Sequence, residues 1–206
     1  MDNKLGNQYY KLKTSFFSLL TLFFISCQTD SRLEGAKEAV EKMKSMQIKR
    51  VTNTQVVTIV DDWGQRIVKQ AQAQLEMALK TPKTDNAQLC RLGSLSQIDS
   101  LEKLYSVKID LLGTKDAQNP TLSAKEQELI GAYLYNAQNH ISQITNIQKL
   151  GDSVLIYNAP VATDNIICQK CFADDATKLG VWRVKFLKNE VIRKVNTKSL
   201  QKKRKD

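Results

Sequence analysis

Hydrophobic residues in the first half of the chain recur every three or four positions, the spacing of one helix face. Residues 32–50 show this spacing, and residues 56–79 show it over a longer stretch. The polar segment 81–86 ends the pattern, and a shorter helix is expected over residues 87–104. The longest predicted helix carries one apolar stripe: Val56, Ile59, Val60, Trp63, Ile67, Ala71, Leu75 and Leu79.

The middle of the chain changes from helical spacing to alternation. Residues 105–111 alternate as a strand does, and the polar residues 113–120 predict a loop. Ser123 with Glu126 three residues later forms a capping-box pattern, which predicts that a helix begins there.

The last third favours short strands. Residues 141–150 and 153–161 predict a hairpin that turns at Gly151 and Asp152. A final pair is expected from residues 180–186 and 191–195, joined at residues 188–189. These elements predict an α+β fold in which long N-terminal helices lie against one face of a small antiparallel sheet.

The first residues have the layout of a signal peptide. Lys4, Lys11 and Lys13 precede the uncharged apolar run 16–25. A helix of about ten residues, rising ~1.5 Å per residue, would cross only about half of a ~30 Å hydrocarbon core. The run is therefore too short for a comfortable transmembrane helix.

The segment Phe24-Ile25-Ser26-Cys27 resembles the lipobox of bacterial lipoproteins, although Phe24 stands where leucine is usual. The resemblance implies cleavage before Cys27 and acyl chains on that cysteine, which bind the protein to membrane lipid. The polar residues 28–31 are then expected to form, with Cys27, a tether between the lipid anchor and the domain. The alternative is an ordinary secretory signal whose apolar segment happens to end in a cysteine.

Charge and length fit an envelope protein with one main domain. The chain has a net charge of +10, with 31 basic and 21 acidic residues. Residues 1–26 contain three lysines and one aspartate, so 28 basic and 20 acidic residues remain, a net charge of +8. We expect a signal peptide at 1–26, a lipidated tether at 27–31, a domain at 32–197 and a basic tail at 198–206. The tail is interpreted as a solvated chain end.

The expected partners of this basic chain are anionic lipid and polysaccharide rather than nucleic acid. No alternation of basic and aromatic residues suggests a nucleic-acid surface. The sequence also lacks a glycine-rich phosphate loop and a nucleophile elbow, and its single histidine, His140, has no apparent catalytic partners. We therefore expect a protein that is not an enzyme.

Three cysteines remain after Cys27, and two of them form the motif Cys168-Gln-Lys-Cys171. An odd number outside the cytoplasm leaves at least one thiol without an intramolecular partner, or bound to something else. Phe172 follows the motif directly.

The order of features from Val56 to Val195 resembles the PAS-like c-haem sensor domain. This family occurs alone in the bacterial envelope or ahead of kinases and cyclases. The matching features are the Cys90 segment, Ser106-Val107-Lys108-Ile109, Leu112, Lys115, Asn119, the Ser123 helix, and a CxxC before a glycine-containing strand.

The resemblance implies a PAS-like fold, haem c as a cofactor and another envelope signalling protein as a partner. In the family, two thiols of a CxxCH motif link the haem and the histidine binds its iron. Cys168 and Cys171 match the thiols, and Cys90 stands where the family has a second axial ligand. Phe172 replaces the histidine.

Three roles for the cysteine pair therefore remain open. The first is haem attachment through Cys168 and Cys171, with Cys90 as a possible axial ligand. The second is a disulfide between Cys168 and Cys171, either structural or redox-active. The third is a zinc site made of Cys90, His140, Cys168 and Cys171.

The sequence thus favours a membrane-anchored envelope lipoprotein with a sensor or binding domain related to c-haem sensors. Two other functions stay open. One is a structural or interaction protein whose former haem pocket is filled by Phe172. The other is a thiol-disulfide protein that uses Cys168 and Cys171.

Overall fold

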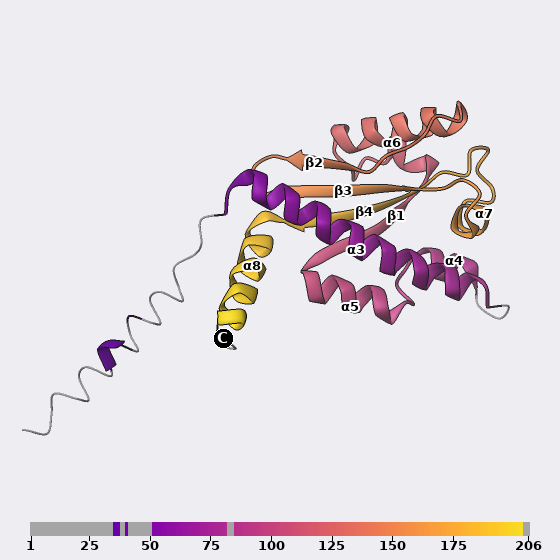
Figure 1. Cartoon of the computed structure of the whole chain (residues 1–206). Helices are drawn as coiled ribbons and strands as arrows, with labels where there is room; N and C mark the ends of the chain where they lie inside the picture. Colours follow the sequence, from indigo (N-terminus) through magenta and orange to yellow (C-terminus); the bar gives the residue numbers. More distant parts are fainter. Residues whose placement is uncertain (1–34, 38–39, 41–50, 82–84, 204–206) are drawn as a thin grey trace, which may run out of the picture. The chain divides into compact units, whose positions relative to one another are not determined.

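The computed structural model describes residues 35–37, 40, 51–81 and 85–203, with side chains as far as residue 195 (Figure 1). The predicted signal peptide, Cys27 and the tether lie outside the described residues, as does most of the expected helix 32–50. The chain divides into two units, Met1–Ile48 and Lys49–Asp206. The sheet and helices α3 to α8 belong to the second unit.

This unit is built on a four-stranded antiparallel sheet, which confirms the predicted α+β fold. Its strands are β1 (Val107–Leu112), β2 (Asn146–Leu150), β3 (Val154–Val161) and β4 (Gly180–Leu187). Their order across the sheet is β1-β4-β3-β2, so the last strand in sequence lies in the interior.

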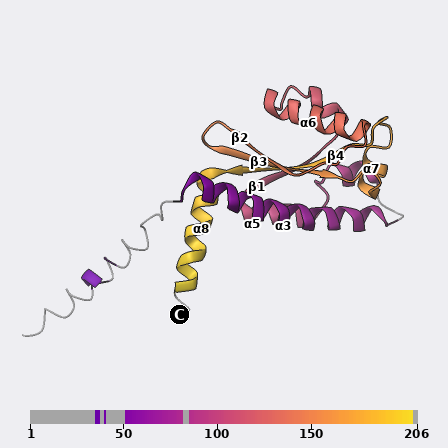
Figure 2. The same ribbon diagram turned by 45° about the horizontal axis from the view of Figure 1, so that its top comes forward.

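Helices cover both faces of the sheet, not one face as predicted. Helix α3 (Asn53–Leu79) and helix α5 (Ser96–Tyr105) lie on one face, and helix α6 (Ala124–Gln138) lies on the other (Figures 1 and 2). Strand alternation explains the difference, because apolar residues of β4 point to both sides. Trp182, Val184 and Phe186 join the core with α3, whereas Val181 joins a second, smaller core with α6.

Helix α3 forms where the apolar stripe predicts it. Thr52 and Gln55 form a reciprocal capping box at its N-terminus. The stripe is almost entirely buried: of the eight predicted residues only Ile59 keeps intermediate exposure. The Ser123–Glu126 capping box likewise begins α6, as predicted.

The predicted helix over residues 87–104 is two helices, α4 (Asn86–Cys90) and α5. Leu92, between them, adopts a left-handed backbone with φ 64°, which a continuous helix cannot contain. Leu89 and Leu92 are both buried.

The predicted strand at residues 191–195 is wrong, because these residues belong to helix α8 (Lys188–Lys203). Strand β4 is already paired with β1 on one side and β3 on the other, so it has no free edge for another strand. Val191 and Val195 have helical spacing, and Val191 is buried.

Two loop predictions are corrected in part. The hairpin turn at Gly151 is confirmed with a left-handed φ of 61°, but β2 begins only at Asn146, so residues 141–145 are not a strand. The expected loop 113–120 contains the short 3-10 helix η2 (Thr114–Gln118). The cysteine motif lies in helix α7 (Ile166–Cys171). Among the described residues, no helix has the length and apolar content needed to cross a bilayer.

Gly64 of α3 allows the ring of Tyr157 on β3 to pack against the helix. A Cβ at position 64 would lie 2.3 Å from the ring carbon Cγ of Tyr157. We expect Gly64→Ala to lower the free energy of unfolding by about 1–3 kcal/mol, because the ring must move within a packed core. Urea denaturation measures this change.

Gly131→Ala in α6 is the matched control, since nothing lies within 4 Å of its Cβ position. Alanine there is expected to be neutral or to stabilise by up to about 1 kcal/mol, through helix propensity. Equal effects at Gly64 and Gly131 would contradict the close packing of α3 on Tyr157.

Candidate functional site

The cysteine motif is connected to α4 by a disulfide. Cys90 at the end of α4 and Cys171 at the end of α7 are bonded, with their Cα atoms 5.5 Å apart and 81 residues between them in sequence. The predicted Cys168–Cys171 disulfide is therefore wrong. Along α7 the two cysteines point in different directions: Cys168 towards the sheet and Cys171 towards α4.

Cys168 is a fully buried thiol. Its sulfur lies 3.9 Å from the carbonyl oxygen of Val161 and packs beside Gly180 at the start of β4. Burial raises the pKa of this thiol to about 11. At neutral pH the group is therefore protonated, which disfavours both nucleophilic attack and metal ligation.

The ring of Phe172 occupies the space between two glycines. A Cβ at Gly113 would lie 2.3 Å from the Phe172 ring, and a Cβ at Gly180 would lie 3.2 Å from it. The ring is thus built into the junction of β1 and β4, in the place where the resembled family has its histidine.

The residues present do not fit covalent attachment of haem. Thioether formation needs two free thiols facing the porphyrin, but Cys171 is in a disulfide and Cys168 is inaccessible. Cys90, the expected axial ligand, is the partner in that disulfide.

The predicted zinc set is not assembled either. His140 is exposed and follows the end of α6 with a left-handed φ of 56°, as a helix-ending residue does. Two of the three cysteines are disulfide-bonded and offer no thiolate. Within residues 51–81 and 85–203, no three His, Cys, Asp or Glu residues are grouped so that they could hold a metal ion.

A groove of about 670 Å³ opens beside the disulfide, along the edge strand β1, between α5 on one sheet face and the segment before α6 on the other. Its apolar lining comes from the α4–α5 connection, α5, β1 and the segment before α6: Leu92, Ile98, Ile109, Leu111, Leu112 and Leu122. Its polar lining comes from Arg91, Asp99, Glu102, Lys108, Asp110, Asp116, Asn119, Thr121, Arg183 and Lys185.

An ion-pair network forms one end of the groove. The Arg183 guanidinium lies 2.7 Å from Asp110 and 2.7 Å from Glu126, and its side chain is only 12% exposed. Ser123 donates to the other Glu126 oxygen through its amide and hydroxyl. Burial raises the pKa of Glu126, but the hydrogen bonds from Ser123 and Arg183 outweigh this effect and hold the pKa below its ordinary value of 4.5.

Two lysines face each other across the groove floor. Lys108 of β1 and Lys185 of β4 are register partners on the same sheet face. Lys108 pairs with Glu102 at 3.0 Å, and the hydrogen bond to Glu102 raises the lysine's pKa. No ion pair joins Lys185 to another described residue. Like charges placed directly opposite destabilise a sheet unless an anion lies near.

Comparisons with protein-family models, curated proteins and solved structures found no match to this chain. The resemblance to c-haem sensors therefore stays a prediction, and the candidate site is argued from its own geometry.

Sequence analysis missed the groove although a signal was present. Lys108 and Asp110 alternate with apolar residues along β1, as Arg183 and Lys185 do along β4. This alternation shows that each strand has one polar face. It could not show that the two polar faces adjoin, because that depends on β4 pairing with β1.

The disulfide and the buried thiol predict a distinct labelling pattern. In the folded protein without reductant, we expect Cys168 to resist alkylation, and in denaturant to react. Peptide mapping by mass spectrometry should find Cys90 linked to Cys171. Replacing both bonded cysteines by alanine should cost about 2–4 kcal/mol of unfolding free energy, because the loop they close is long. A Cys168–Cys171 peptide would contradict this pairing.

The network around Glu126 predicts acid sensitivity. Because the folded pKa is below the ordinary value, the group contributes stability above pH 4.5 and loses it as the pH falls through the folded pKa. We expect Glu126→Gln to lower the unfolding free energy at pH 7 by roughly 3 kcal/mol, since Arg183 loses a buried partner. The variant should also lose less of its remaining stability between pH 5 and pH 3 than the unaltered protein.

Glu128→Gln on the same helix is the control, because Glu128 is exposed. Thermal unfolding across this pH range checks both variants. Parallel pH curves for Glu126→Gln and the unaltered chain would contradict the assignment.

Proposed function

We propose that this protein is a lipid-anchored envelope protein whose domain binds a small anionic ligand in the groove over β1 and β4, as a sensor or binding module. The proposal is carried by one observation, the pairing of Lys108 with Lys185 on an open groove floor where only one of them has a counter-charge.

The groove suits carboxylate or phosphate groups of small molecules. Lys185 supplies a positive charge that can bind an anion. Lys108 lies opposite it and adds to the positive potential, although Lys108 is itself paired with Glu102. The Arg183 guanidinium is held by Asp110 and Glu126, so it lines the groove without being free to bind the ligand. The leucine and isoleucine side chains of the lining would cover an apolar part of the ligand.

The lipid anchor rests on the signal-peptide layout and on Cys27. The disulfide between Cys90 and Cys171 supports export, because disulfides persist in oxidising compartments such as the bacterial periplasm. In this proposal the acylated cysteine fixes the protein to a membrane, and ligand binding is passed to another envelope protein.

A second candidate, a structural or interaction protein, is favoured by Phe172. Its ring fills the space between Gly113 and Gly180, as expected where a cofactor site has been replaced by packing. A thiol-disulfide role has less support, because Cys168 is buried and Cys171 bonds to Cys90 instead.

Binding of small anions tests the proposal. We expect citrate, succinate or inorganic phosphate to raise the thermal midpoint and to shift backbone amide signals of β1 and β4 in NMR spectra. Lys185→Gln should weaken binding about tenfold by calorimetry, the loss expected for one charge-assisted contact.

Lys125→Gln removes the same charge from an exposed site on α6 outside the groove and should leave binding unchanged. Equal losses in the two variants, or no shift with any anion, would contradict the groove as a binding site. An absorption spectrum of protein made together with haem-maturation machinery separates the anion-binding function from haem binding. A Soret band would show that haem is bound and would favour the haem function.

A further inference from the structure

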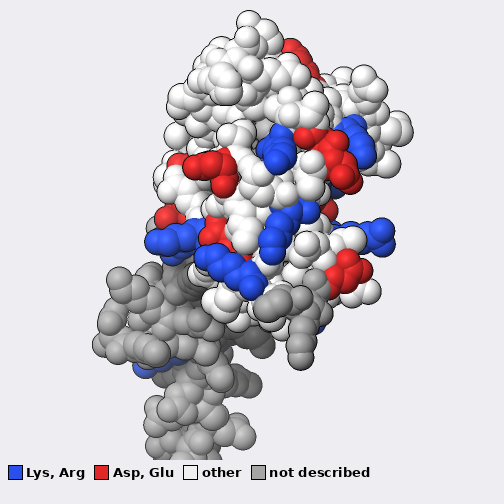
Figure 3. All heavy atoms as spheres, turned by 90° about the vertical axis from the view of Figure 1, so that its right-hand side faces the viewer, with Lys and Arg blue, Asp and Glu red and all other residues white. Residues whose placement is uncertain are grey.

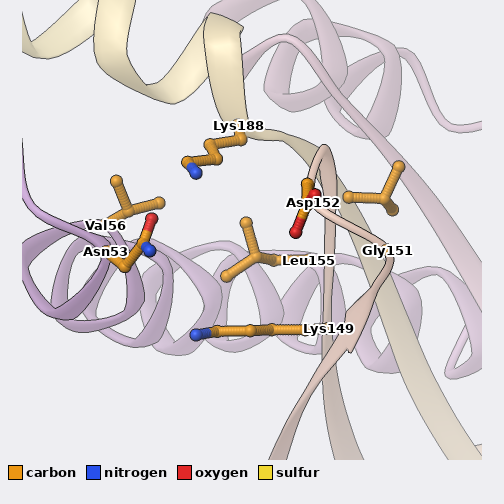
Figure 4. Close-up of a pocket in the computed structure, with 8 residues that line it drawn as sticks. Asn53, Val56, Lys149, Gly151, Asp152, Leu155 and Lys188 are labelled. Atoms are coloured by element: carbon orange, nitrogen blue, oxygen red, sulfur yellow. The ribbon is translucent and has the colours of Figure 1, made fainter.

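Strands β1 and β2 form the two edges of the sheet. The pocket at the end of β2, beside the hairpin turn and the starts of α3 and α8, measures only about 60 Å³ (Figure 4). The groove along β1 measures about 670 Å³, within the range of roughly 300–1,000 Å³ that is usual for ligand pockets. Every residue from Lys108 to Leu112 lines this groove. The β1 edge therefore has room for a ligand along its length.

The main chain of β1 points alternately towards β4 and towards the open edge. The Ile109 amide donates to the Glu102 carboxylate at 2.9 Å, so the main-chain groups of Ile109 point away from β4. Lys188, directly after β4, donates its amide to the carbonyl of Ser153, so by the same alternation the main chain of Lys185 turns to β1. The two observations agree: residues 108, 110 and 112 pair with β4, and residues 107, 109 and 111 face the edge.

The free part of this edge is short. At one end, the Glu102 carboxylate occupies the Ile109 amide. At the other end, the Gly113 amide donates to Asp116 Oδ2 at 2.8 Å, and the Gly113 carbonyl accepts from the Asp116 amide at 3.1 Å. Within residues 51–81 and 85–203, no hydrogen bond uses the Ile109 carbonyl or the outward amide and carbonyl of Leu111. One donor and two acceptors therefore remain for a ligand.

The side chains that line the groove differ between its two sides. Those on the α5 side include Leu92, Ile98, Ile109 and Leu111, which belong to the main core or pack against it. Lys108 and Lys185 lie on the α6-bearing side. The whole lining contains four basic and four acidic side chains, so charge alone gives an anion little affinity. Basic and acidic side chains are also interspersed on the face drawn in Figure 3.

We propose that the ligand of the groove is a short extended peptide that bears a carboxylate and adds to β1 as a fifth strand. The inference rests on the groove being a ligand site, as proposed above, and it names the chemical class of that ligand. Two of the three free main-chain groups are carbonyl oxygens, which need a donor, whereas a carboxylate offers only acceptors. A peptide supplies both donors and acceptors at the spacing of a strand, as in other cases of strand addition to a sheet edge.

The geometry of the edge specifies the peptide. If it adds in the antiparallel direction, as every strand pair of this sheet does, residues opposite Ile109 and Leu111 point to the apolar side. The residue opposite Lys108 points to the side that carries Lys108 and Lys185. A matching peptide is apolar at its first and third positions and acidic at its fourth. Because the free stretch ends at Gly113, it suits a short peptide better than the full edge strand of a second copy.

The test uses the full chain with its disulfide intact and the peptide acetyl-Val-Thr-Val-Glu-amide as the probe. We expect calorimetry to detect binding of this peptide. N-methylation of both valines should weaken it about tenfold, because the two hydrogen bonds to the Ile109 and Leu111 carbonyls are lost. Glutamine in place of the peptide glutamate should also weaken it about tenfold, and Lys185→Gln should cause no further loss with that neutral peptide.

Two proline variants test the edge from the side of the protein. Leu111→Pro removes the outward amide but no bond to β4, and proline is tolerated at such edge positions. We expect this variant to bind the peptide about tenfold more weakly. Lys149→Pro is the matched control, because its amide faces the outer edge of β2, and it should bind as the unaltered chain does. Without any variant, hydrogen exchange of the Leu111 amide should slow when the peptide is bound.

Equal binding of the N-methylated and unmodified peptides, or unchanged exchange of the Leu111 amide, would overturn strand addition. Citrate binding that depends on Lys185 would in that case leave the proposed anion site intact. Peptide binding that is sensitive to N-methylation but not to Lys185→Gln would support strand addition and contradict the role of Lys185 in the proposed function. A dimer in sedimentation that Leu111→Pro abolishes would overturn the peptide in favour of a second copy.

Discussion

The burial of α3 against β3 and β4 is the interaction on which the rest of this domain depends. Val60, Ile67 and Leu75 are fully buried along one side of the helix, and Trp182 and Phe186 meet them from the sheet. This apolar contact supplies most of the driving force for folding, since burial of each such side chain is worth roughly 1.5–3 kcal/mol. It also dictates the position of β4, whose alternate residues must face α3.

The second face of β4 follows from that choice. Once Trp182 and Val184 point to α3, Arg183 and Lys185 must point the other way. Arg183 then lies between Asp110 and Glu126, and the Glu126 carboxylate both accepts the capping bond from the Ser123 amide at the start of α6 and pairs with the guanidinium. Lys185 lies two residues further along the strand, lacks such an ion-pair partner among the described residues, and faces the groove. The candidate site is thus the polar side of the strand that the apolar core positions.

Local signals in the sequence predicted the parts of the fold that depend on local physics. The stripe on α3, the capping box at Ser123 and the turn at Gly151 are each decided by residues close in sequence, and all three are confirmed. The errors arose where distant parts of the chain meet. Residues 191–195 could not be a strand because β4 was already paired on both edges, and no local pattern reveals this. The predicted Cys168–Cys171 disulfide is wrong for the same reason. Closeness in sequence favours that pair, whereas the packing of α7 on α4 places Cys171 beside Cys90.

Phe172 and the two glycines beneath it form a single unit in evolutionary terms. Any side chain at position 113 would overlap the phenylalanine ring, and one at position 180 would press on both that ring and the Cys168 sulfur. A side chain at position 113 therefore requires a different residue, or a displaced ring, at position 172, whereas one at position 180 requires only small shifts of the ring and the sulfur. Relatives that keep an aromatic residue at 172 should therefore keep glycine at 113. This link joins two segments that lie far apart in the sequence, so the pair of positions 113 and 172 should vary together.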